Sequence, residues 1–263
     1  MRKYLVLAAI ALSGCGTFQK APSEALRDLA PAGRLRAAIN LGNPVLASRD
    51  AAGQPRGVSV DLARELASRL GVPVELIPFD AAGKVVEAGK AGIWDIAFVA
   101  LDPARAAEIA QSTPYVVIEG AYLVRQDSPL RANDEVDRSG NRVVVARNSA
   151  YDLFLTRNFK QAQFVRTTTS ALVVDTLLKE NLEVAAGVKQ QLEMDARRVP
   201  GVRLLPGRFM VINQAMASQI GKEAGARYVR EFVEDMKASG FVARALQRHG
   251  IEGAAVAPAG DPK

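Results

Sequence analysis

The sequence predicts an α/β protein of two lobes, each built on a mainly parallel sheet flanked by helices. Short runs rich in apolar residues alternate with helical runs along residues 33–250, which is the pattern of β-α-β units. Residues 94–101 form a nearly continuous apolar run, as expected for a strand covered on both faces. A long strand-like stretch at residues 115–125 separates two such series, so we expect a cleft between two lobes.

The elements of the first series carry local signals. Leu62, Leu66 and Leu70 recur every four residues and predict a helix that ends at Gly71. Asp102 and Pro103 open another helix, as N-cap and first helical residue. The expected order is strand 35–41, helix 61–70, strand 74–79, helix 83–91, strand 94–101 and a helix from residue 103, a right-handed βαβαβ unit.

The second series begins after the loop at residues 126–129. Thr169 or Ser170 is the expected N-cap of its second helix. We expect, in order, strand 142–146, helix 150–158, strand 164–165, helix 171–182, strand 184–188, helix 190–197, strand 209–217 and helices 223–237 and 241–248. Residues 251–263 are rich in Ala, Pro and Gly, and we predict a disordered tail there.

Rare residues exclude several functions. The chain has one Cys, at position 15, and one His, at position 249, so a zinc site with three or four Cys/His ligands is excluded. His249 lies at the end of a predicted helix, where a histidine is ordinarily favoured by the helix dipole. The net charge of +6 is scattered along the chain, so nucleic-acid binding is not expected. We predict no catalytic residue, no cofactor and no metal.

The first 15 residues predict an export signal. Arg2 and Lys3 precede an apolar run over residues 4–12 that is too short to span a bilayer, and Ser13 and Gly14 precede Cys15. The segment 12–15 is similar to the bacterial lipoprotein box, in which the Cys is lipidated. An ordinary cleaved signal with an incidental Cys is the alternative. We predict lipidation at Cys15, with residues 16–32 as a tether.

The order of several segments resembles the family 3 extracellular solute-binding proteins, the receptors of amino-acid ABC importers. The resemblance rests on Gly57 to Leu62 before a helix, Gly92 to Ala97, Asp102 to Arg105, Arg142 to Tyr151, and the C-terminal helices from Phe232 to Phe241 and from Arg244 to His249. It covers about residues 33–250. No single motif is specific, but their order and spacing together are.

The resemblance implies a type II periplasmic-binding fold, in which the first lobe comes from both ends of the chain. The expected parts are lobe 1 at residues 33–123 plus 211–250, lobe 2 at residues 124–210, and hinge strands near residues 122–125 and 208–212. It also implies a periplasmic or cell-envelope receptor, expected to be a monomer, that binds a small carboxylate ligand and delivers it to an ABC permease. With Cys15 lipidated, it would also contact the membrane.

The resemblance also implies ligand contacts. Arg105 matches the family arginine that pairs with the carboxylate of the ligand, which suits a guanidinium because its fork donates two parallel hydrogen bonds. A solvated arginine is the alternative. Asn148 and Ser149 lie at a helix start, where free N–H groups favour an anion, although either residue could simply cap its helix. Asn43, Phe79 and Asp80 lie on first-lobe loops that face the cleft in relatives.

Departures from the family pattern alter the expected ligand. Ala100 lies where amino-acid binders usually carry a hydroxyl, and the acid that pairs with a ligand ammonium is replaced by Val188 or Lys189. We therefore expect weakened recognition of α-amino acids. Lys189 could contact a second anionic group, or simply open the next helix, and Glu193 could supply the missing acid.

Two other functions remain open at the level of sequence. A few relatives on this fold are cyclohexadienyl dehydratases, which need an acid in the cleft to expel a leaving group. The chain could also be a ligand-sensing lipoprotein that signals rather than transports.

Overall fold

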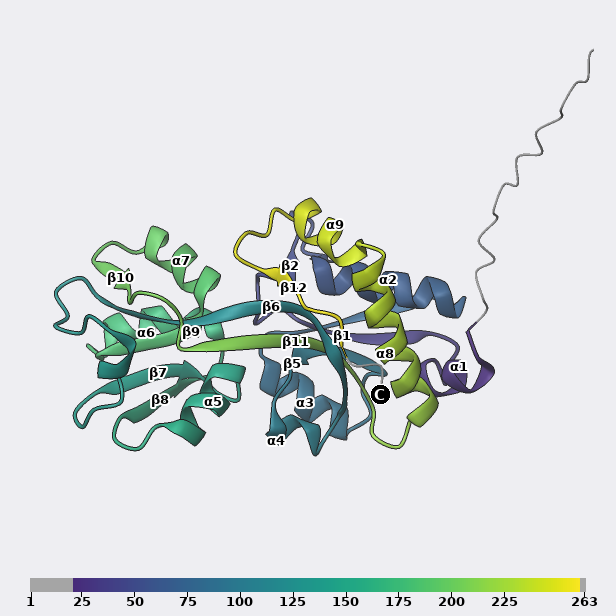
Figure 1. The fold of residues 1–263 in the computed structure, drawn as a ribbon, viewed down its shortest axis with the longest axis horizontal. Helices are drawn as coiled ribbons and strands as arrows, with labels where there is room; N and C mark the ends of the chain where they lie inside the picture. Colours follow the sequence, from purple (N-terminus) through teal and green to yellow (C-terminus); the bar gives the residue numbers. More distant parts are fainter. Residues whose placement is uncertain (1–20, 261–263) are drawn as a thin grey trace, which may run out of the picture.

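The computed structural model describes residues 21–260 as a mixed α/β molecule of two lobes. The predicted export signal with Cys15 and residues 16–20, as well as residues 261–263, lie outside the described part. One sheet runs through both lobes in the order β4-β1-β5-β11-β6-β9-β7-β8. We call the part built on β1, β4 and β5 the first lobe and the part built on β7, β8 and β9 the second lobe; Figure 1 shows them at the right and the left.

Parallel pairing of short apolar strands organises the first lobe. β1 (Leu35–Asn40) pairs in parallel with β4 (Val74–Phe79) on one side and with β5 (Ile96–Ala100) on the other. All five residues of β5 are buried, because helices cover both faces of the sheet. The remaining elements of this lobe are α1 (Ser23–Leu29), the hairpin β2 (Ser48–Arg49) and β3 (Pro55–Arg56), α2 (Val58–Leu70), α3 (Ala82–Lys90), α4 (Pro103–Ala106), α8 (Glu223–Ala238) and α9 (Phe241–Arg248).

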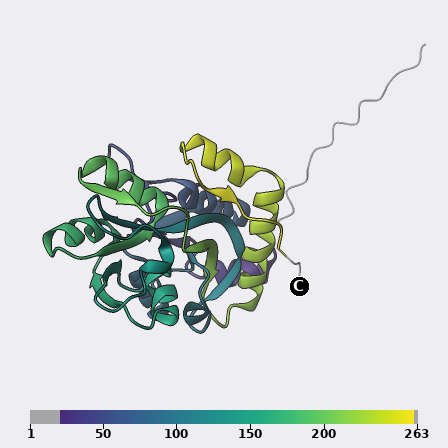
Figure 2. The ribbon, with the colours of Figure 1, turned by 60° about the vertical axis from the view of Figure 1, so that its left-hand side comes forward.

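The second lobe has the same construction on a smaller scale. β7 (Arg142–Ala146) pairs in parallel with both β8 (Gln163–Thr167) and β9 (Val184–Val188). The other elements are the 3-10 turns η1 (Asn133–Glu135) and η2 (Ser170–Leu172), α5 (Ala150–Asn158), α6 (Val173–Lys179), α7 (Lys189–Arg198) and β10 (Val202–Leu204). In Figure 2 this lobe lies apart from the C-terminal helices, which are drawn in yellow.

Two long antiparallel strands connect the lobes. β6 (Ala110–Arg125) pairs with β11 (Met210–Ser218) from Ala110↔Ser218 to Gly120↔Met210. Further along, β6 pairs with β9 of the second lobe, while β11 pairs with β5 of the first. Both strands therefore belong to both lobes (Figure 1), and any movement of one lobe relative to the other must bend them.

Two predictions about the chain ends are corrected by the structure. Residues 23–29, which were predicted to belong to the tether, form the helix α1, and its Leu29 is fully buried. Asp28 Oδ2 accepts a hydrogen bond at 3.0 Å from the backbone N–H of Gly225 in α8. Residues 251–260 are not a free tail, because β12 (Ala255–Val256) pairs with β6 and Ala257 N donates to Tyr115 O at 3.1 Å. Within residues 21–260, no helix is long and apolar enough to cross a bilayer.

Trp94 and Asp95 hold the start of β5 in place. The fully buried Trp94 donates Nε1–H to Val85 O at 2.7 Å and packs against Gly89, where a Cβ would lie 2.6 Å from the indole ring. Asp95 accepts from both the backbone and the guanidinium of Arg36. These contacts fix the direction of β5, whose carboxyl end leads to the cleft.

Candidate functional site

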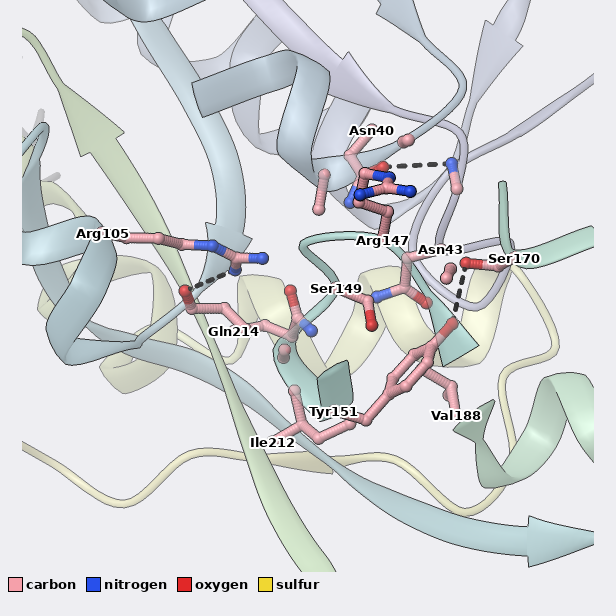
Figure 3. A pocket seen from close by; sticks show the side chains of 16 residues that line it. Asn40, Asn43, Arg105, Arg147, Ser149, Tyr151, Ser170, Val188, Ile212 and Gln214 are labelled. Carbon is pink, nitrogen blue, oxygen red and sulfur yellow. Dashed lines mark hydrogen bonds between the residues drawn. The ribbon is translucent and has the colours of Figure 1, made fainter. Parts of the chain in front are cut away.

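A pocket of about 40 Å³ lies between the lobes, where strand ends of the first and the second lobe meet. In α/β sheets this edge is the usual place for a ligand, because the loops after the strands converge there. Figure 3 shows polar side chains from both lobes converging on it. The lining residues are Asn40, Gly42, Asn43, Ala81, Ala82, Ala100 and Arg105 from the first lobe, Ala146, Arg147, Ser149, Ala150, Tyr151, Ser170 and Val188 from the second, and Ile212 and Gln214 from β11.

Arg105 enters the pocket from the short helix α4. Asp102 starts this helix by accepting a hydrogen bond from Ala104 N at 2.9 Å, and Pro103 occupies the first helical position. The guanidinium then lies against the end of β5, where Nη1 donates to Ala100 O at 2.9 Å. Nη2 donates to Asn148 O of the second lobe at 2.8 Å. Arg105 is only 3 % exposed, so its charge is almost completely removed from water.

No carboxylate balances this buried charge among the described residues. Asp102, the nearest acid along the chain, forms a two-pronged ion pair with Arg157 instead, with Nη1–Oδ1 at 3.0 Å and Nη2–Oδ2 at 2.7 Å. Burial lowers the pKa of Arg105 to about 10, against a smaller opposing effect of Asp102. A buried cation with two carbonyl partners and no anion is an incomplete ion pair, which favours an anion entering the pocket.

Asn148 and Ser149 form the turn between β7 and α5. Ser149 is the N-cap of α5, and its Oγ accepts from Asp152 N at 3.1 Å. Asn148 has a positive φ of 57°, a conformation that asparagine tolerates better than most residues, and its N–H donates to Asp152 Oδ2 at 2.8 Å. Capping therefore accounts for the Ser149 side chain, which still faces the pocket, whereas Asn148 joins the turn through its backbone N–H.

Asn43 contributes a buried acceptor that has no partner. Its side chain is 6 % exposed, and Oδ1 makes no hydrogen bond to the described residues. The preceding turn is tight, because Asn40 Oδ1 accepts from Gly42 N at 3.1 Å and a Cβ on Gly42 would lie 2.7 Å from Asp80 O. An unsatisfied buried amide oxygen costs free energy, so a ligand donor at this position would be stabilising.

Comparisons with known proteins place the chain in a family. The family model of bacterial extracellular solute-binding proteins, family 3, matches residues 35–251. The chain belongs to this family. Comparison with curated proteins gives no match.

Solved structures share the type II periplasmic-binding fold of this solute-binding protein at low sequence identity. An L-cysteine solute receptor of Neisseria gonorrhoeae is 21 % identical with a TM-score of 0.75, over 87 % of this chain and 95 % of that one. An ancestral amino acid-binding protein described as a precursor of cyclohexadienyl dehydratase is 19 % identical with a TM-score of 0.72, over 86 % and 99 %. A histidine kinase sensor domain is 21 % identical with a TM-score of 0.75, over 85 % and 98 %.

The structure of this solute-binding protein brings part of the predicted site together. Arg105, Ser149, Asn43 and Ala100 line the pocket. Ala100 contributes its carbonyl, which accepts from Arg105 and, at 3.0 Å, from Gln111 Nε2. Asn148 adjoins the pocket through its own carbonyl rather than its side chain.

Three predicted contacts lie elsewhere. Phe79 packs against the cluster around Trp94, and the exposed Asp80 pairs with Lys84 at 2.8 Å. Lys189 donates to Glu119 at 3.1 Å, and Glu119 also accepts from Arg208 at 2.7 Å. Hydrogen bonds from Arg208 and Lys189 lower the pKa of Glu119. Since this pairing holds the Lys189 ammonium on Glu119, the structure gives no support to a ligand contact there.

Several residues that line the pocket were not predicted from the sequence. Arg147 is exposed and lines the pocket from the second lobe, and Gln214 does so from β11. Tyr151 is buried, donates to Ser170 Oγ at 3.1 Å, and has its pKa raised by burial. Residues 40–43 and 169–170 form a turn and a helix cap, and such patterns can be recognised in a sequence. They predict a loop, but not whether its side chains face the cleft. Within residues 21–260, no group of acidic, His or Cys side chains is placed to hold a metal ion.

Contacts across the cleft show that the lobes are closed on each other in this structure. The hydrogen bond from Arg105 to Asn148 O and the Asp102–Arg157 ion pair both join the first lobe to the second. Gly83 of α3 faces Asn148 so closely that a Cβ at position 83 would lie 2.7 Å from the Asn148 Cβ. The pocket is therefore assembled by closure.

Proposed function

We propose that this family 3 protein is the extracytoplasmic receptor of an ABC-type importer and captures a small carboxylate-bearing solute by closing its lobes on it. The observation that carries the proposal is Arg105, a guanidinium that is 3 % exposed at an interlobe pocket and has no acidic partner among the described residues. A carboxylate would complete the ion pair with hydrogen bonds that strengthen in a dry site. In the proposed complex, Ser149 and Asn43 add hydrogen bonds to the same ligand.

The closed arrangement supports a role in capture. Arg105 contacts both lobes, so a ligand bound to it would interact better with the closed form than with an open one. A ligand shifts such an equilibrium only by its differential affinity for the two forms. A small solute is supported by two similar structures, an L-cysteine receptor of Neisseria gonorrhoeae and a binding component of an ABC transporter from Wolinella succinogenes complexed with lysine.

The proposed cellular setting follows from the family and the leader. The receptor would act in the periplasm or cell envelope as a monomer, deliver its solute to an ABC permease, and be held at the membrane by lipidation of Cys15. These assignments rest on the family match at residues 35–251 and on the sequence of residues 1–15. Neither a cofactor nor a metal forms part of the proposal.

Two other candidates are favoured by specific relatives. The precursor of cyclohexadienyl dehydratase favours an enzyme, but a dehydratase needs a general acid, and no Asp, Glu or His lines the described pocket. Release of phenylpyruvate from prephenate would revive that candidate. The histidine kinase sensor domain favours a sensor. Permease and ATPase genes beside this one would support import, and a kinase gene would support sensing.

Substitution of Arg105 tests the proposal. With the Arg105→Ala protein, calorimetry against a panel of small carboxylates should give at least about 30-fold weaker binding of whichever acid binds the unmodified protein, because truncating one partner of a buried charge pair typically costs 2–5 kcal/mol. Arg227→Ala is the matched control, since Arg227 is exposed on α8 away from the pocket. Retained affinity in Arg105→Ala, or an equal loss in Arg227→Ala, would contradict the proposal.

A further inference from the structure

The pocket carries an unusual balance of charge. Two guanidinium groups line it, those of Arg105 and Arg147, and no acidic residue does. Figure 3 shows them on different sides of the pocket, Arg105 reaching in from the first lobe and Arg147 from the second. Arg147 forms no ion pair with the described residues, in contrast to the neighbouring second-lobe arginines Arg157 and Arg166, which pair with Asp102 and Asp152. The site is therefore positive by two charges before any ligand enters.

The carboxylates around the pocket are engaged elsewhere. Asp102 holds Arg157 with both oxygens. Asp152 accepts from Asn148 N through one oxygen and from Arg166 Nε, at 2.9 Å, through the other. Glu119 is shared between Lys189 and Arg208. A ligand ammonium would meet two cations and no free anion, and like charges in a dry site strongly disfavour binding.

The neutral polar groups of the pocket suit a hydroxyl or a second carboxylate. Asn43 Oδ1 is a buried acceptor without a partner, and a single O–H donor would satisfy it. The amide of Gln214 and the hydroxyls of Tyr151 and Ser170 line the same space. Arg147 is exposed at the pocket, so it can reach a second anionic oxygen that the buried Arg105 does not contact.

The size of the pocket limits the length of the ligand. Its volume of about 40 Å³ corresponds to on the order of three water molecules, since one water needs roughly 10–15 Å³ on the same scale. A long side chain such as that of lysine or arginine would require the lobes to stand further apart than they do here. The space fits an acid of only a few carbon atoms.

We infer that the pocket selects a short-chain acid that carries a hydroxyl or second carboxylate in place of an ammonium, with Arg105 binding the first carboxylate and Arg147 the second oxygen group. The inference rests on the proposed function, because it specifies the ligand of the same site. Val188 lines the pocket with an apolar side chain at the N-cap of α7, so a charge introduced there would enter the pocket, and we assign it as a specificity-determining residue.

Matched pairs of ligands test the inference directly. Calorimetry and thermal shift compare glycolate with glycine, lactate with alanine, and malate with aspartate, pairs that differ in hydroxyl against ammonium. The unmodified protein should bind the hydroxy acid of at least one pair at least about tenfold more tightly than its amino acid, a difference of about 1.4 kcal/mol. Arg147→Ala should weaken binding of malate more than binding of lactate.

Two variants at Val188 separate charge from shape. Val188 is the N-cap of α7 and has no side-chain capping bond, and Asp and Asn are both preferred at such positions, so both variants should fold. Val188→Asp should gain at least about tenfold for the amino acid and lose affinity for its hydroxy-acid partner. Val188→Asn introduces a side chain with nearly the shape of aspartate but without its charge, and should keep the preference of the unmodified protein for the hydroxy acid.

The outcomes distinguish this inference from the proposed function. Tighter binding of the amino acid by the unmodified protein, abolished in Arg105→Ala, would overturn the inference and leave the proposed function standing. Binding that does not depend on Arg105, or no binding by any acid of either series, would overturn both. An equal gain in Val188→Asp and Val188→Asn would remove Val188 as a determinant of charge selection.

Discussion

Arg105 combines burial, a full positive charge and two carbonyl partners, which is an unusual state for an arginine. Burial lowers its pKa from the ordinary range of an arginine to about 10, because the charged form has lost its hydration. In the folded, ligand-free protein the site therefore begins to lose its proton well below the pH at which an exposed arginine would. A bound carboxylate stabilises the charged form and raises the pKa again.

Proton uptake on binding is the expected result. Near pH 10 a bound acid should draw in about half a proton per ligand, and near pH 7 almost none, because Arg105 is half deprotonated in the free protein at its pKa and almost fully protonated three pH units lower. Affinity should accordingly fall as the pH rises through about 10. Calorimetry in two buffers of different ionisation enthalpy measures the uptake. Equal, negligible uptake at both pH values would mean that the pKa of Arg105 is not lowered in the ligand-free protein.

The sequence predicted some of the lining residues and not others for a physical reason. Arg105 was expected at the ligand because it matches the family arginine, and the cap pair Asp102-Pro103 placed it in a helix that starts beside a strand end. Arg147 and Gln214 have no such signal. Both lie in or beside strands, and whether their side chains face the cleft depends on how the two lobes meet, which no local pattern encodes.

At the scale of elements, α3 approaches the second lobe through a glycine. Gly83 lies in the first turn of α3, where a Cβ would come 2.7 Å from the Asn148 Cβ. Alanine is favoured over glycine in a helix by up to about 1 kcal/mol. The methyl group added by Gly83→Ala can therefore stabilise α3 and at the same time obstruct closure of the lobes. The thermal midpoint reports the first effect and ligand binding reports the second.

Gly83→Ala should keep or raise the thermal midpoint and still weaken ligand binding, with a larger radius of gyration by solution scattering in the presence of ligand. Asn148→Gly removes the opposing Cβ, and its φ of 57° suits glycine. The double variant Gly83→Ala, Asn148→Gly should therefore recover closure. Normal affinity in Gly83→Ala alone would show that α3 and Asn148 do not limit the approach of the lobes.

Elements at the chain ends show what composition cannot predict. Residues 255–256 pair with β6 through backbone groups, and backbone pairing requires no apolar alternation, so an Ala/Pro/Gly-rich segment gave a misleading signal of disorder. α1 is short and begins after Pro22 without a side-chain cap. It is fixed mainly by packing against α8, a partner almost two hundred residues away along the chain. Strands with both faces covered, such as β5, were predictable because their apolar runs are continuous.

At the scale of the molecule, both ends of the described chain lie on the first lobe (Figure 1). α1 begins at Ser23, so the segment from Cys15 to the folded body can extend over at most about 28 Å, at about 3.5 Å per residue. If Cys15 is lipidated, the first lobe is held close to the bilayer and the second lobe is free to move against it.

Cys15→Ser should transfer the protein from the membrane fraction to the soluble envelope fraction, because a lipid chain is then no longer attached. Fractionation of cells followed by immunoblotting measures this. Thr17→Ala, two positions further on, is the control and should leave the distribution unchanged. A Cys15→Ser protein that stays with the membrane would argue against lipidation and for another means of attachment.

The position of β11 in the sheet has a consequence for the order of folding. β5 pairs with β1 on one edge, and its other edge is completed by β11, in which Gln214 pairs with Ala100. The whole second lobe lies between these two strands in the sequence, so the first lobe cannot complete its sheet until the second has been synthesised. Such non-local pairing slows folding and leaves an open strand edge in the meantime. A chain cut short before residue 210 would expose the apolar edge of β5 and is expected to aggregate rather than fold as a single lobe.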